Sequence, residues 1–121
     1  MRIAASIRRV NPLNVIETEP GSYSLTMYTG DLPVDPVVEE LGHVPNGVFW
    51  DGVAEWLVRT RMPALDGRFE YDSEGGMFCA YGSDRTALEE LRDGMAPVVT
   101  SGDQVRQLVA AAEEAGFEFD D

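Results

Sequence analysis

Cysteine is almost missing from this sequence, because Cys79 is the only one among 121 residues. A single cysteine cannot form a disulfide within the chain, so nothing indicates an oxidising compartment. Long apolar runs are missing as well, since no segment approaches the roughly 20 apolar residues that a membrane-spanning helix needs. We therefore expect a cytoplasmic protein that neither depends on disulfides nor inserts into a membrane.

Histidine and lysine are equally scarce, since His43 is the only histidine and all nine basic residues are arginine. Zinc sites need several histidines or cysteines, and a nucleophilic enzyme needs a base beside its nucleophile. His43 lies in an expected turn, and Cys79 alternates with Met77 and Tyr81 on an expected core face, which favours a loop histidine and a buried, unreactive thiol. Calcium-binding and phosphate-binding loops are absent too. The sequence predicts no catalytic residue, no metal site and no cofactor.

Positively charged residues are scarce as well: the chain has 22 acidic and nine basic residues, and its net charge is −13. An excess of this size repels nucleic acid and anionic lipid, so we expect neither as a partner. A charged partner would be basic. Apolar residues make up 44% of the chain, which is ordinary for a globular domain, and 121 residues suffice for one domain with its own core.

Two β-hairpins are predicted. Residues 13–19 and 22–28 suit strands, with "EPGS" as the turn between them. In the second of these strands, apolar residues alternate with serine and threonine, which is typical of a sheet with one wet face. The stretch "GRFEYDSEGGMFCAY" repeats this pattern around the turn "SEGG".

Each hairpin is followed by two predicted helices. After the first hairpin, a short helix begins with Asp35 as its N-cap and stops at Gly42, and a second helix runs from about Phe49 to Arg61. After the second hairpin, Ser83 or Thr86 caps a third helix.

The last helix begins at Ser101, with Gln104 as its capping partner, and stops at Gly116. The closing "FEFDD" is either a short strand or a docked tail. The order strand, strand, helix, helix therefore occurs twice.

These elements predict an α+β fold with a mostly antiparallel sheet in a single layer and helices packed on one of its faces. The sheet has four strands, or five if "FEFDD" adds one. Residues 1–12 form a variable N-terminal extension, and residues 13–121 form one domain. The repeated order suggests an internal duplication, with residues 13–66 matching residues 67–121.

Candidate contact residues come from the acidic faces and from the second helix. Its apolar residues cover an arc of roughly 200°, wider than one core-facing stripe needs, which leaves Phe49 and Trp56 at an edge. Asp35 with Glu39, and Asp51 with Glu55, are expected on solvated helix faces. Like charges four residues apart destabilise an exposed helix, which a basic partner would explain. The candidate partner-binding residues are Asp35, Glu39, Asp51, Glu55, Trp56, Asp120 and Asp121.

Three separated motifs carry a family resemblance: "GHVPNGVFWDGVAEWL", then "FEYDSEGGMFCAYGSDRTALEEL", and finally "GFEFDD". Together they resemble the immunity protein 51 family, the predicted antidotes of bacterial polymorphic toxin systems. The resemblance covers nearly the whole chain from about Leu13. It implies a small non-catalytic α+β protein that binds a cognate toxin and blocks it, and it carries over no catalytic residue.

Two other functions stay open from the residues alone. An acidic regulatory adaptor would use the same surface to restrain a basic host ribonuclease or another basic enzyme. A hydrolase would use paired carboxylates with a metal. For all of them we expect a monomer or a weak homodimer.

Overall fold

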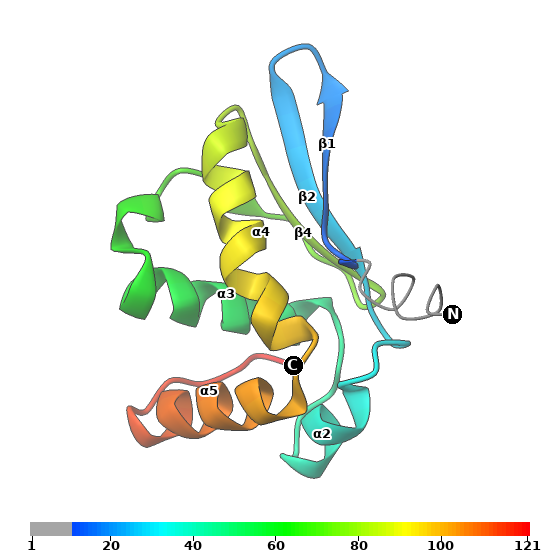
Figure 1. The fold of residues 1–121 in the computed structure, drawn as a ribbon, viewed down its shortest axis with the longest axis vertical. Coiled ribbons are helices and arrows are strands. Elements are labelled where there is room, and N and C mark those ends of the chain that lie inside the picture. Colours follow the sequence, from blue (N-terminus) through cyan, green and yellow to red (C-terminus); the bar gives the residue numbers. More distant parts are fainter. Residues whose placement is uncertain (1–10) are drawn as a thin grey trace, which may run out of the picture.

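The computed structural model describes residues 11–121, so the predicted extension, residues 1–12, falls almost wholly outside it. Residues 11–121 form a four-stranded sheet and four α-helices, which confirms the predicted α+β fold (Figure 1). The elements in order are β1 (Asn14–Glu19), β2 (Ser22–Tyr28), α2 (Asp35–Glu40), α3 (Gly47–Arg61), the 3-10 helix η1 (Pro63–Leu65), β3 (Glu70–Tyr71), β4 (Met77–Gly82), α4 (Arg85–Val99) and α5 (Gly102–Glu114).

The sheet has the strand order β1-β2-β4-β3, and every neighbouring pair is antiparallel. Both hairpins form as predicted. The turn between β1 and β2 contains Gly21 at φ 84°, a backbone conformation that favours glycine. The closing "FEFDD", residues 117–121, adds no strand and forms a docked tail instead.

The core-facing side of β4 differs from the prediction. Phe78 and Ala80 are fully buried, because they pair with Met27 and Leu25 of β2 and share their face. The expectation that Cys79 shares a core face with Met77 and Tyr81 is therefore wrong, since these residues point to the opposite side of the sheet. Cys79 is nevertheless a buried free cysteine there, as predicted of its thiol.

The first predicted N-cap is also wrong. Val34 occupies the N-cap position of α2, and Asp35 is the first helical residue. The Asp35 carboxylate reaches back to accept a hydrogen bond from the backbone N–H of Leu32. Gly42, at φ 88°, follows the end of this helix as predicted.

The caps of the longer helices follow one rule, in which a side-chain oxygen accepts an early backbone N–H. Asp84 caps α4 by accepting from Ala87, so neither Ser83 nor Thr86 is the cap. Ser101 caps α5 as predicted, by accepting from Gln104.

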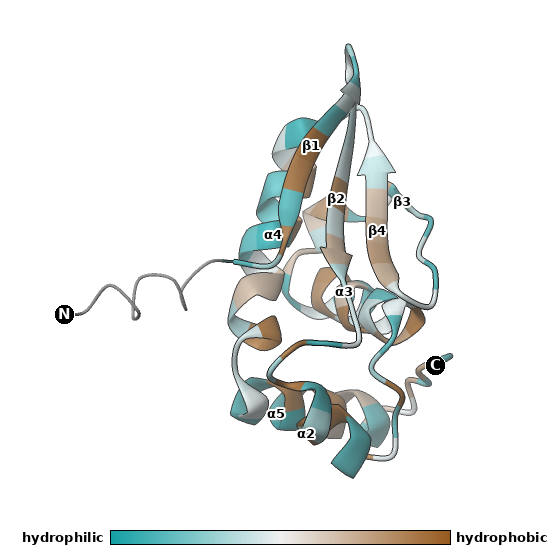
Figure 2. Ribbon diagram, turned by 90° about the vertical axis from the view of Figure 1, so that its right-hand side faces the viewer, coloured by the Kyte–Doolittle hydropathy of each residue, from teal (hydrophilic) through white to brown (hydrophobic). Residues whose placement is uncertain are grey.

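The helices form two tiers beneath one face of the sheet. Helix α3 contacts β4, and α4 lies along β2, β1 and β4, while α2 and α5 contact each other beyond them (Figures 1 and 2). Trp50 and Phe49 of α3 are both fully buried, so Phe49 is not an edge residue available for contact. Because α3 contacts the sheet and α5 packs mainly on other helices, the two halves are arranged differently, and the duplication stays a prediction.

No helix within residues 11–121 is both long enough and apolar enough to cross a membrane.

Candidate functional site

The start of α3 is held tightly against the β3–β4 hairpin. Asn46 caps α3 by accepting the backbone N–H of Phe49, and Gly47 donates its own N–H to the carbonyl of Gly75. A Cβ atom at Gly47 would overlap the carbonyl oxygens of Glu74 and Met77. Only glycine therefore allows this close approach, which brings the first turn of α3 beside residues 72–74.

Asp51 is the residue most affected by this approach. Its carboxylate accepts a hydrogen bond of 2.6 Å from the Ser73 hydroxyl, which in turn accepts the N–H of Cys79 at 2.8 Å. The expectation of a solvated helix face is therefore wrong for Asp51, which is half-buried. Burial raises the pKa of Asp51 to about 6, the nearby charge of Glu55 adds to the rise, and the Ser73 hydrogen bond opposes it.

The C-terminal tail, residues 117–121, docks across the outer side of α3. Phe119 stacks on Phe49 with ring centroids 5.2 Å apart, and Phe117 lies 5.5 Å from the ring of Trp56. Gly52 has no side chain to displace the Phe119 ring. Since alternate residues of "FEFDD" bury their rings, the residues between them, Glu118 and Asp120, face outward and are exposed.

His43 fastens the end of this tail. Its Nδ1 lies 2.9 Å from the Asp121 carboxylate, its Nε2 lies 2.7 Å from that of Glu113, and the Val44 N–H also donates to Asp121. Burial lowers the pKa of His43, but the hydrogen bonds to Glu113 and Asp121 outweigh it, so the pKa lies above its usual value. These contacts leave the Asp121 side chain only 8% exposed and hold the tail in place.

Docking of the tail brings together carboxylates that are far apart in the sequence. Asp51, Glu55, Glu118 and Asp120 line one shallow recess of about 120 Å³. Asp66 lines the adjoining cavity together with Glu55, and Asp72 and Glu74 flank Ser73, whose hydroxyl binds Asp51. We call these residues the acidic surface: Asp51, Glu55, Asp66, Asp72, Glu74, Glu118 and Asp120.

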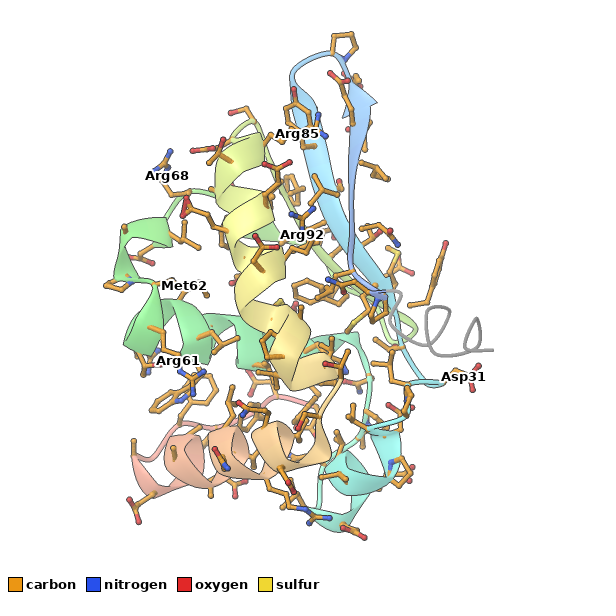
Figure 3. The ribbon with its side chains drawn as sticks, viewed as in Figure 1. Asp31, Arg61, Met62, Arg68, Arg85 and Arg92 are labelled. Atoms are coloured by element: carbon orange, nitrogen blue, oxygen red, sulfur yellow. The ribbon has the colours of Figure 1, made fainter. Side chains whose placement is uncertain are left out.

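No ion pair within residues 11–121 involves a carboxylate of the acidic surface. Arg59, one turn after Glu55, places its guanidinium 5.2 Å from the centre of the Phe117 ring. Four further arginines pair with carboxylates that lie outside the surface: Arg68 with Asp84, Arg85 with Glu89, Arg92 with Asp93, and Arg106 with Glu40. Figure 3 shows Arg85 and Arg92 along α4, with Arg68 close to its start. Among residues 11–121, no three side chains of the metal-binding types converge where they could hold an ion.

The structure thus unites only part of the predicted site. Asp51, Glu55 and Asp120 meet in the recess, and Trp56 is half-buried against the tail beside them. Asp35 and Glu39 lie on α2, which packs on α5, and they form no part of this recess. Asp66, Asp72, Glu74 and Glu118 were not among the residues predicted from the sequence. Only the alternation within "FEFDD" could have indicated that Glu118 faces outward.

Asp35 departs from the solvated face expected for it. Burial is the main reason that its pKa lies above the usual value, and the charges of Glu39 and Asp31 add to this, while the Leu32 hydrogen bond opposes it. Glu39 is exposed, as expected.

A second exposed surface is the sheet face opposite the helices. Ile16, Ser24 and Tyr81 form one row across three strands, and Tyr28 pairs with Met77 at the end of β2. Tyr28 is 80% exposed, Ile16 48% and Tyr81 40%, which is high for large side chains.

The chain is similar to one known protein family. A family model described as Immunity protein 51 matches residues 13–114. This chain belongs to the immunity protein 51 family. The match begins one residue before β1 and ends with the last residue of α5, so it includes Asp51, Glu55, Asp72 and Ser73 but not the tail residues Glu118 and Asp120. Searches of the curated proteins and of the solved structures found no match.

Proposed function

We propose that this immunity protein acts without catalysis, by binding a basic toxin domain through the acidic surface and blocking it. The observation that carries the proposal is the proximity of carboxylates from four segments of the chain. Four of them line one recess, Asp66 lines the adjoining cavity together with Glu55, and Asp72 and Glu74 flank Ser73, whose hydroxyl binds Asp51. Uncompensated like charges weaken the folded state, so their convergence favours a function that uses them.

Asp51 supports this proposal most directly. A half-buried carboxylate with a neighbouring like charge is destabilised when ionised, and a cation from a partner would relieve that penalty. Complementary charge also speeds the encounter of two proteins above the neutral range of roughly 10⁵ to 10⁶ M⁻¹s⁻¹. Speed matters for an inhibitor that must reach the toxin before the toxin reaches its target.

The proposed interface contains Asp51, Glu55, Trp56 and Asp120 from the predicted set, and adds Glu118 and the β3–β4 hairpin carboxylates. Asp121 contributes indirectly, because it anchors the tail that carries Asp120 and Glu118. Asp35 and Glu39 stay predicted contacts of a separate patch on α2. Family membership supports a toxin as the partner over a host enzyme.

Coexpression tests the proposal. The toxin domain encoded next to this gene is expressed in a sensitive bacterium, with this protein or with an empty vector, and survival is counted. We expect survival only with this protein, together with a complex of the two purified chains. A locus without a toxin gene, or full killing despite coexpression, would contradict the proposal. Retrieval of one abundant host enzyme instead would favour the adaptor.

A further inference from the structure

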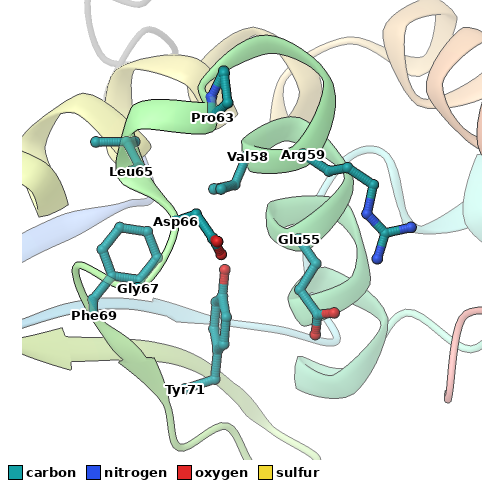
Figure 4. Close-up of a pocket in the computed structure, with 9 residues that line it drawn as sticks. All are labelled: Glu55, Val58, Arg59, Pro63, Leu65, Asp66, Gly67, Phe69 and Tyr71. Atoms are coloured by element: carbon teal, nitrogen blue, oxygen red, sulfur yellow. The ribbon is translucent and has the colours of Figure 1, made fainter.

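A cavity of about 480 Å³ lies next to the acidic surface, between the second half of α3, the η1 loop and β3 (Figure 4). Cavities of roughly 300 to 1,000 Å³ are typical of sites that take a ligand or an inserted group. The residues that line it fall into two chemical kinds, apolar walls and charged margins.

The apolar walls contain two aromatic rings. Phe69 and Tyr71 meet edge to face, with ring centroids 5.8 Å apart and an interplanar angle of 84°. Val58 and Leu65 are buried and complete the apolar lining. Tyr71 also packs against Phe78 of the core at 6.3 Å, so the ring is held in place from below. Rings fixed in this way present their edges and faces to an occupant without further ordering.

The charged margins are mainly negative. Glu55 and Asp66 lie on two sides of the Tyr71 hydroxyl, which points toward Asp66 in Figure 4. Burial raises the pKa of Tyr71, and the charges of Glu55, Asp51 and Asp66 raise it further, so the phenol stays protonated. Arg59 is the one basic residue among the lining residues, and its guanidinium lies over Phe117.

We propose that this cavity receives an arginine side chain presented by the bound toxin. The inference deepens the proposed function and rests on it. The guanidinium would pair with Glu55 and Asp66, while its flat face lies against the aromatic ring of Tyr71 or Phe69. Arginine combines the carboxylate contact and the ring contact, since its planar guanidinium forms bidentate hydrogen bonds with carboxylates and stacks on aromatic faces. The volume leaves room for apolar side chains that flank the arginine in the partner.

A titration without any toxin tests the cavity. N-acetyl-arginine methylamide is added to the ¹⁵N-labelled protein, and amide chemical shifts are followed by NMR. We expect saturable shifts centred on Gly67, Phe69 and Tyr71, with a dissociation constant on the order of 1 mM for so small a probe. The citrulline analogue has the same shape but no charge, and we expect it to bind at least about fivefold more weakly. Equal binding of the two probes, or shifts spread evenly over the protein, would overturn the proposal.

Two isosteric variants test whether a carboxylate at the cavity, rather than the net charge of the protein, attracts the arginine probe. Asp66→Asn removes one margin of the cavity and is expected to weaken arginine binding about two- to fivefold, the range of an exposed ion pair. Asp103→Asn removes an exposed carboxylate of α5 that does not line the cavity, and we expect it to leave the affinity unchanged. Equal weakening by both variants would mean that net charge alone attracts the probe, which would overturn the site.

The outcome is separable from that of the proposed function. Survival on coexpression without a saturable arginine site would place the interface outside the cavity and overturn this inference alone. A saturable site in a protein that gives no survival would support the cavity and contradict the proposed function.

Discussion

Replacing Asp51 by asparagine is expected to stabilise the folded protein at neutral and higher pH. The asparagine side chain has nearly the same shape and can still accept the Ser73 hydroxyl, but it carries no charge beside Glu55. The folded protein keeps the proton of Asp51 up to a pKa of about 6, whereas the unfolded chain releases it near 3.8. Stability of the wild type therefore falls as the pH rises through this window, and that of the variant does not.

The size of the effect follows from the same values. A rise in pKa from 3.8 to about 6 corresponds to at most about 3 kcal/mol. Because the carboxylate is only half-buried, solvent screening reduces this to about 1 kcal/mol, or about 4 °C in Tm for a domain of this size.

Thermal unfolding of wild type and variant, followed by circular dichroism at pH 4 and pH 8, measures the difference. We expect equal midpoints at pH 4 and a higher midpoint for Asp51→Asn at pH 8. Glu90→Gln is the matched control, since it removes one exposed negative charge from α4. A variant that is no more stable than wild type at pH 8, or that gains no more than the control, would refute the view that Asp51 is held at a cost to the fold.

Three further predictions concern the hairpin contact, the tail and the encounter with the toxin. Gly47→Ala is expected to destabilise the fold by about 2 kcal/mol in urea unfolding, because its Cβ would overlap two carbonyls, whereas Gly75→Ala meets nothing within 4 Å and should be nearly neutral. His43→Gln should lower the free energy of unfolding by about 2 kcal/mol near pH 6, where protonated His43 binds two carboxylates. This difference from wild type should shrink as the pH rises from 6.5 through the raised pKa of His43, and a difference that does not vary with pH would contradict the prediction. Glu55→Lys should slow association with the toxin about threefold to tenfold at low salt, with weaker salt dependence and little change in Tm, while Glu90→Lys should slow it less. Equal association rates of the two variants would move the interface to the open sheet face.

Local patterns in the sequence were sufficient for most of the fold. The alternation in 22–28 places Leu25 and Met27 inward, and Ser101 and Gly116 bound the last helix as predicted. The errors arose where a local rule has several solutions. Asp84, Ser83 and Thr86 can all accept a backbone N–H, so the capping rule does not choose among them, and Asp84 is the cap in the structure. The strand β4 has apolar residues on both faces, so alternation does not show which face is buried.

The candidate site was less predictable, because its members lie on four separate segments. Charge alone indicated Asp51, Glu55 and Asp120 in the sequence, and the proximity of Asp120 to the other two depends on the docked tail. Asp72 and Glu74 gain significance only through the contact of α3 with the β3–β4 hairpin, which Gly47 permits, and Asp66 only through the cavity that it lines with Glu55.

The amino-acid order alone determined the strands, the helices, the family and the large negative charge, because these depend on neighbours within a few residues or on simple counting. Tertiary structure decided which carboxylates share one surface, that Asp51 is half-buried beside Ser73, and that a cavity with aromatic walls opens next to them. Such properties depend on distances between segments up to about 70 residues apart and on the exclusion of water between them, and no local pattern encodes either.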